Sequence, residues 1–109
     1  MPAAASVGQP SGMTSDQVEQ RLTGLSGWTR DGEAIQKQFV FDAFASAVAF
    51  VVRVGFDAEA ADHHPDVLIS NYKKVTLTFT THSAGGLTDK DFAGADAAER
   101  VFAGTGNRA

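Results

Sequence analysis

Three histidines, His63, His64 and His82, are all the histidines of this 109-residue chain, and they lie close together in its second half. Imidazole has an unperturbed pKa of about 6.5, so histidine can donate and accept protons near neutral pH. Three imidazoles gathered at one site would suit general acid and base catalysis. Their proximity in the chain is therefore the strongest indication of function.

Two carboxylates flank the histidines, Glu59 one helical turn before His63 and Asp91 after His82. A carboxylate that accepts a hydrogen bond from an imidazole can hold the ring in one orientation. Each also has a structural alternative. Glu59 can be a solvated helix residue, and Asp91 can cap the helix that follows Thr88. Both alternatives stay open at the level of sequence.

A metal site is the rival interpretation of the same side chains, because imidazoles and a carboxylate can bind zinc. Adjacent His63 and His64 project in divergent directions, and the His-x-His or i, i+4 pairs typical of zinc ligands are absent from the sequence. The chain also contains no cysteine. We therefore rank a metal site below acid and base catalysis by the same histidines.

The first elements that must position these residues are a short helix and a hairpin. Thr14 begins a capping-box pattern, and the hydrophobic spacing that follows predicts a helix ending near Gly24. Strands are predicted over residues 28–30 and 34–40, with Asp31-Gly32 as the tight turn between them.

A long helix and a second hairpin follow. Hydrophobic periodicity predicts the helix over 43–61, with Asp42 as its N-cap. Strands are predicted over 66–70 and 74–81, which places His82 on the polar face at a strand end. Thr88 then begins a final helix.

The order helix-strand-strand-helix-strand-strand-helix predicts an α+β fold in two layers. Two hairpins joined by a long helix favour one four-stranded antiparallel sheet with the helices packed on one face. We expect a single domain over 14–104, with a flexible tail at 1–13 and a frayed end at 105–109. The long helix is apolar over most of its circumference, which predicts a homodimer or a homotetramer.

Composition excludes several other classes of protein. Hydrophobic residues make up 43% and charged residues 20% of the chain, which is typical of a globular domain. The net charge of −4 disfavours direct binding to nucleic acid. No apolar segment approaches the roughly 20 residues of a membrane span, and the N-terminus does not resemble a secretory signal. The default expectation is a cytoplasmic protein without membrane contact.

From Glu59 to Asp91 the chain resembles the pterin-4a-carbinolamine dehydratases, also known as dimerisation cofactors of a homeodomain transcription factor. The motifs that carry this resemblance are Asp62-His63-His64-Pro65, Tyr72, Thr80-Thr81-His82 and Asp91. The resemblance extends upstream over about residues 14–103, through Gly27-Trp28, Lys37-Gln38-Phe39 and Val52-Arg53-Val54.

The resemblance implies dehydration of 4a-hydroxytetrahydrobiopterin, or a related 4a-hydroxytetrahydropterin, to quinonoid dihydropterin and water. By motif position, His63 and His82 would be general acids, one for each stereoisomer of the substrate. His64 would chiefly bind the pterin, with a base role as the alternative. Glu59 and Asp91 would support the imidazoles, and Trp28 would either stack on the pterin or belong to the core. A non-enzymatic dimerisation or assembly module on the same fold is the competing function.

Overall fold

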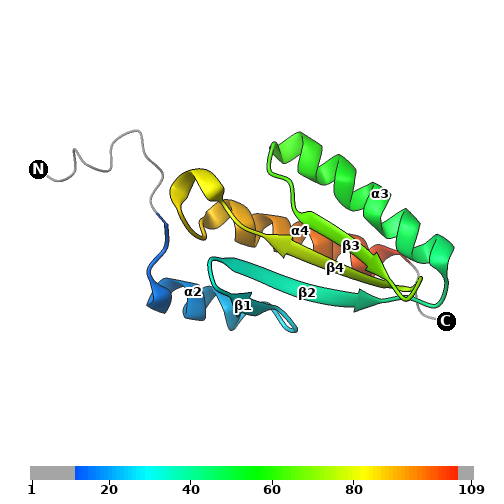
Figure 1. Cartoon of the computed structure of the whole chain (residues 1–109), viewed down its shortest axis with the longest axis horizontal. Helices are drawn as coiled ribbons and strands as arrows, with labels where there is room; N and C mark the ends of the chain where they lie inside the picture. Colours follow the sequence, from blue (N-terminus) through cyan, green and yellow to red (C-terminus); the bar gives the residue numbers. More distant parts are fainter. Residues whose placement is uncertain (1–11, 106–109) are drawn as a thin grey trace, which may run out of the picture.

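The computed structural model describes residues 12–105, which form three α-helices, four strands and one short 3-10 helix. The predicted α+β order is confirmed (Figure 1). Most of the predicted N-terminal tail and C-terminal end lies outside the described residues. In chain order the elements are α2 (Ser15–Leu22), β1 (Thr29–Asp31), β2 (Ala34–Val40), α3 (Phe44–Ala61), β3 (Asp66–Ser70), β4 (Lys74–Phe79), η1 (His82–Ala84) and α4 (Asp89–Gly104).

The strands form one antiparallel sheet in the order β1-β2-β4-β3. Strand β4 therefore lies between β2 and β3, and its register is defined by pairs such as Phe39 with Val75 and Gln36 with Thr78. Burial alternates along β4, because Val75 and Leu77 face the helices and Thr76 faces away. Helices α3 and α4 cover the apolar face, as predicted (Figure 1).

Aromatic rings fill the space between this face and the helices. Phe50 of α3 lies 4.8 Å from Phe39 and 5.0 Å from Phe41, measured between ring centroids. Phe102 of α4 packs 5.1 Å from Phe39. The core thus joins both long helices to β2, and it supports the end of the sheet opposite the histidines.

Both predicted capping boxes, at Thr14 and Thr88, are confirmed at the starts of their helices. In each box the threonine side chain accepts a hydrogen bond from a backbone N–H of the first turn. The side chain of Gln17 or Asp91 in turn accepts one from the backbone N–H of the threonine. The prediction of Asp42 as the N-cap of the long helix is wrong, because α3 begins one residue later and Ala43 occupies the N-cap position. The N–H of Phe41 donates to Lys73 O at 2.8 Å, so the chain is still held beside the sheet just before the helix starts.

Gly94 allows α4 to lie directly against Phe79 of β4. A Cβ atom at Gly94 would lie 2.4 Å from Phe79 Cε1. We expect Gly94→Ala to lower the free energy of unfolding by about 1–3 kcal/mol, because overpacking displaces the ring or the helix. Gly55→Ala in α3 is the matched control. Nothing lies within 4 Å of its added methyl group, and we expect a gain of about 0.5–1 kcal/mol. Urea denaturation measures both, and equal stability of Gly94→Ala and wild type would refute this account.

Candidate active site

The end of α3 places His63 against the sheet. Asp62 adopts a left-handed conformation with φ of 52°, and its backbone N–H donates to Glu59 O at 3.2 Å. The N–H of His63 then returns to Ala58 O at 3.1 Å, which completes the helix terminus. As a result the His63 ring lies parallel to Phe79, with 6.2 Å between centroids and 17° between planes.

Asp91 is the partner of His63, although 28 residues separate them in the sequence. Asp91 Oδ1 lies 2.6 Å from His63 Nε2, and the carboxylate is fully buried. Its other oxygen, Oδ2, accepts from Thr81 Oγ1 at 2.7 Å and from the backbone N–H of Thr88 at 3.0 Å. A buried carboxylate is costly unless it is hydrogen-bonded, and this one has three donors.

The protons of this network can be assigned from its donors and acceptors. The single hydroxyl proton of Thr81 is directed to Asp91, so the hydroxyl of Thr88 must donate to Thr81 Oγ1 across 2.9 Å. A carboxylate only accepts, so His63 carries a proton on Nε2. The ring nitrogen Nδ1 of His63 is therefore the one left to exchange a proton with a ligand.

His82 follows Thr81 directly and is the first residue of η1, just beyond the end of β4. His82 is exposed to solvent. Within residues 12–105 its side chain forms no hydrogen bond or ring contact. Because Thr81 is bonded to Asp91, the same carboxylate anchors both His63 and the segment that carries His82.

His64 and Glu59 form a separate, exposed pair. Their contact joins His64 Nε2 to Glu59 Oε1 at 3.1 Å, and the two side chains are 57% and 82% exposed. Glu59 lies one turn before His63 but contacts His64, because the left-handed Asp62 redirects the chain. An exposed pair of this kind contributes little to stability.

Trp28 is held in the core. It is 5% exposed, and its ring centroid lies 6.0 Å from that of Phe79, the ring on which His63 also rests. Its Nε1–H donates to Glu99 Oε2 at 2.8 Å, and Lys37 Nζ donates to the same oxygen at 2.6 Å. Stacking of Trp28 on a pterin stays a prediction, and the indole offers little exposed surface for it.

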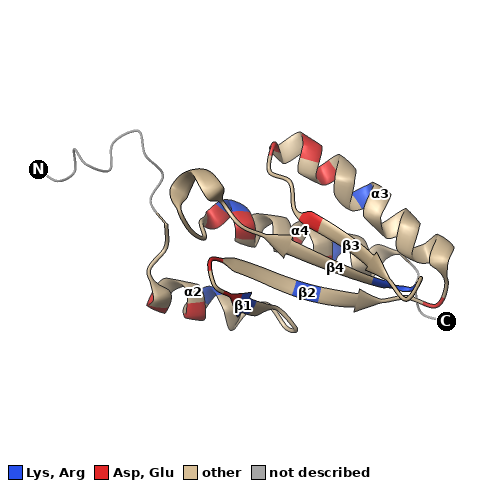
Figure 2. Cartoon of the chain, viewed as in Figure 1, with Lys and Arg blue, Asp and Glu red and all other residues tan. Residues whose placement is uncertain are grey.

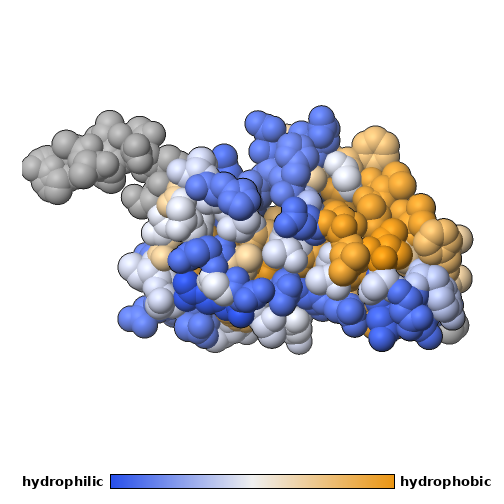
Figure 3. All heavy atoms as spheres, in the orientation of Figure 1, coloured by the Kyte–Doolittle hydropathy of each residue, from blue (hydrophilic) through white to orange (hydrophobic). Residues whose placement is uncertain are grey.

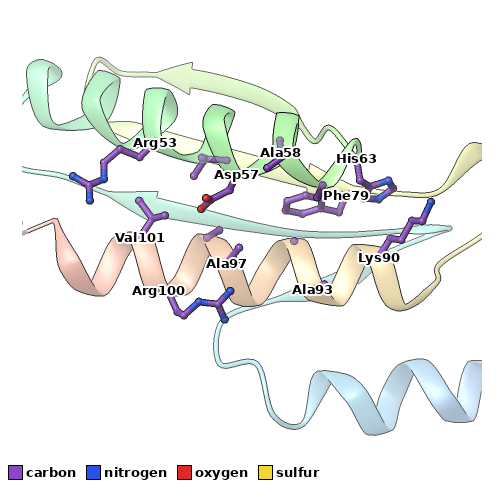
Figure 4. Close-up of a pocket in the computed structure, with 15 residues that line it drawn as sticks. Arg53, Asp57, Ala58, His63, Phe79, Lys90, Ala93, Ala97, Arg100 and Val101 are labelled. Carbon is purple, nitrogen blue, oxygen red and sulfur yellow. The ribbon is translucent and has the colours of Figure 1, made fainter.

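A pocket of about 620 Å³ opens between α3 and α4 beside His63 (Figure 4). His63 and Phe79 line one of its ends, and Lys90 of α4 reaches toward His63 there. His64 and His82 do not line this pocket. The structure thus brings together His63, Asp91 and the η1 segment, whereas His64 is exposed and pairs with Glu59.

Sequence reasoning missed the parts played by Thr81, Thr88 and Lys90. Thr88 was predicted as a helix cap, and its capping box with Asp91 was the available signal that these side chains meet. Nothing in the spacing showed that the same carboxylate also reaches His63. Among residues 12–105 there is no cluster of three or more histidine, aspartate or glutamate side chains that could hold a metal ion. No helix in this part of the chain is long and apolar enough to cross a membrane.

Comparison with solved structures defines the class of fold. A structure described as a transcriptional coactivator/pterin dehydratase from Brucella melitensis matches with a TM-score of 0.79 and 31% identity, covering 84% of this chain and 98% of that chain. A pterin dehydratase-like protein described as a RuBisCO assembly factor in the alpha-carboxysome matches with a TM-score of 0.59. Its identity of 20%, over 69% of this chain and 88% of that chain, shows likeness of fold alone.

The sequence then identifies the family. The family described as Pterin 4 alpha carbinolamine dehydratase matches residues 11–101, and the chain belongs to this family. A relative from Roseiflexus sp. (strain RS-1) is 56% identical over 73% of this chain and 85% of its own length. A relative from Mycobacteroides abscessus is 46% identical over 74% of this chain and 85% of its own length. Both relatives carry the provisional name pterin-4-alpha-carbinolamine dehydratase.

Proposed function

We propose that this protein is a hydro-lyase that dehydrates 4a-hydroxytetrahydrobiopterin, or a related 4a-hydroxytetrahydropterin, to quinonoid dihydropterin and water. Membership of the family supports this proposal. The observation that carries it is the 2.6 Å contact between His63 and the buried Asp91, because it leaves one imidazole nitrogen in a defined state beside a pocket. We place the reaction in the cytoplasm, with no cofactor.

The chemistry requires one proton to be delivered and another to be removed. An acid protonates the 4a-hydroxyl oxygen, the C4a–O bond breaks, and water leaves. Loss of the N5 proton to a base then forms the C4a–N5 double bond. Loss of water involves no net oxidation or reduction, so the reaction needs only proton donors and acceptors. Histidines at the site can supply both.

His63 suits the role of acid. When its Nδ1 carries a proton, the ring is a cation paired with the carboxylate of Asp91. Transfer of that proton to the substrate leaves a neutral ring whose Nε2–H still donates to Asp91 Oδ1. His82, in the neighbouring segment, would serve the other stereoisomer, and His64 would bind the pterin or accept the N5 proton. Glu59 would support His64.

The direct test is to measure the decay of chemically generated 4a-hydroxytetrahydropterin with and without the purified protein. We expect the protein to accelerate dehydration well above the spontaneous rate, with no added metal or cofactor. A rate equal to the spontaneous one, obtained with folded protein and both stereoisomers, would overturn the proposal.

A second proposal concerns self-association, because one face of the molecule is apolar and uncovered. The exposed row on α3 is Phe44, Val48, Val52 and Phe56, and Val67 and Leu68 of β3 are also exposed. Figure 3 shows hydrophobic side chains gathered over α3 and β3, and Figure 2 shows that the N-terminal half of α3 carries no charge. Such a patch is unusual on a monomer. We infer that it joins copies of the chain into a homodimer or a homotetramer.

Val52→Glu tests this inference, since Val52 lies within the exposed row and is 50% exposed. We expect the variant to weaken self-association at least about tenfold, because a charge would replace an apolar contact. Analytical ultracentrifugation measures the change. Gln20→Glu on the exposed side of α2 is the matched control and should leave association unchanged. A wild type that is monomeric at high concentration would contradict the inference.

The same exposed apolar face would also suit the alternative function, a non-enzymatic assembly module. The two functions make different predictions for the folded wild-type protein. An assembly module would bind a stoichiometric partner and show no dehydratase activity, and replacement of the histidines would leave that binding intact. The hydrogen bond between His63 and Asp91 favours the enzyme, because an assembly surface on α3 does not need it.

A further inference from the structure

The pocket that begins at His63 continues between α3 and α4 to a second, positively charged end. Arg53 of α3 and Arg100 of α4 lie there, far from His63 and Lys90 (Figure 4). From Lys90 to Arg100 the groove follows α4 for about 15 Å, at 1.5 Å per residue. A ligand that occupied both ends would therefore be elongated.

The cations of this groove, like Lys73 and Lys74 at the turn between β3 and β4, form no ion pair with a described residue, whereas three other cations of the chain do. Arg21, Arg30 and Lys37 each form an ion pair with a carboxylate. Arg53, Lys90 and Arg100 form none with any described residue. Three unpaired cations thus line one groove of a chain whose net charge is −4.

Asp57 is the only carboxylate among the described residues that line the groove. It lies one turn after Arg53 on α3 and offsets part of the charge at that end. Lys90 and Arg100 have no such neighbour on the groove side of α4. The charged lining therefore has a net excess of positive charge, which favours an anionic ligand.

The floor of the groove consists of small residues. These are Ala58 and Ala61 of α3 and Ala93, Gly94 and Ala97 of α4. The ring of Phe79 closes the floor beneath Gly94, where no side chain would fit. A thin, flat and apolar linker fits such a floor better than a branched polar chain would.

We propose that the groove binds the 6-substituent of the pterin, and that the substrate carries there an extended arylamide tail ending in carboxylates. This inference rests on the proposed function, because the pterin ring must lie beside His63. The linker would lie over the alanine floor, and its carboxylates would reach Arg53 and Arg100. Short neutral substituents would leave those two guanidinium groups unused.

Binding of stable dihydropterins tests the proposal without catalysis. Three probes are needed: 7,8-dihydropteroylglutamate, its uncharged diester, and 6-methyl-7,8-dihydropterin. We expect calorimetry to show that the acid binds at least about fivefold more tightly than the diester at low salt. At 1 M salt, where the Debye length is about 3 Å, that difference should largely vanish.

The variant Arg53→Gln/Arg100→Gln should remove the preference for the acid over the diester and leave binding of the 6-methyl compound unchanged. The matched control is Lys73→Gln/Lys74→Gln, which removes two charges at the turn between β3 and β4 and should keep the preference. Equal affinity for acid and diester in the wild type would overturn the inference. So would an equal loss of preference in both double variants, because that result would reflect net charge alone.

The outcomes also separate this inference from the proposed function. Dehydration of short neutral substrates without any preference for the acid would leave the proposed function intact and refute the groove. Preferential binding of the acid with no dehydration of any 4a-hydroxy compound would support the groove and refute the proposed function.

Discussion

Replacing His63 and His82 together with glutamine is expected to reduce dehydration by about 10²–10⁴-fold, to near the spontaneous rate, because general acid catalysis contributes that much. Glutamine is similar in size and can still donate a hydrogen bond to Asp91, but it cannot deliver a proton. The loss should therefore appear in kcat, with the fold retained. Far-ultraviolet circular dichroism and urea denaturation check the fold.

Single substitutions test the role of each histidine separately. If each histidine serves one stereoisomer of the substrate, His63→Gln should slow one stereoisomer strongly and His82→Gln the other. His64→Gln is the comparison, since His64 is exposed and its one side-chain hydrogen bond among the described residues is to Glu59. It should raise KM more than it lowers kcat. Normal turnover of both stereoisomers by the folded double variant would remove these imidazoles from the mechanism.

Substitution of Asp91 is expected to have the largest effect on stability. Asp91→Ala leaves the hydroxyl of Thr81, the N–H of Thr88 and His63 without their common acceptor in a buried position. Removing one partner of a buried, hydrogen-bonded pair costs about 3–5 kcal/mol. We expect a loss of that size in the free energy of unfolding, measured by urea denaturation.

Asp91→Asn separates positioning from stability. The asparagine has nearly the same shape, but one of its two terminal atoms is a donor that must face another donor. We expect the His63 tautomer to change, which nitrogen NMR of the ring can detect, and dehydration of the stereoisomer assigned to His63 to slow. Asp89→Asn in the same helical turn is the control, because Asp89 is exposed and its ion pair with Arg21 contributes at most about 1 kcal/mol. An unchanged tautomer in Asp91→Asn would contradict the positioning role.

The family resemblance and the residue patterns pointed to the same fold for different reasons. The motifs from Glu59 to Asp91 are particular to the family, and the family assignment is confirmed. The alternation along β4 and the spacing along α3 and α4 are general consequences of burial. The roles of individual histidines remain proposals, because neither the fold nor the relatives test them.

The sequence by itself determined the order of elements, the apolar faces and two helix starts. These features depend on neighbouring residues: a two-residue period for β4, a turn at Gly32 with φ of 61°, and capping boxes at Thr14 and Thr88. Each is a local interaction whose geometry is set by the backbone over a few residues.

Only the tertiary structure decided which carboxylate meets which imidazole. Spacing alone would pair Glu59 with His63, yet the left-handed Asp62 turns His63 toward the sheet and leaves Glu59 beside His64. Asp91 reaches His63 because α3 and α4 pack on the same face of the sheet. The basic groove between those helices arises in the same way, since Arg53 of α3 and Arg100 of α4 line one pocket only because the two helices pack side by side. Contacts of this kind depend on how whole elements pack, which no short stretch of sequence encodes.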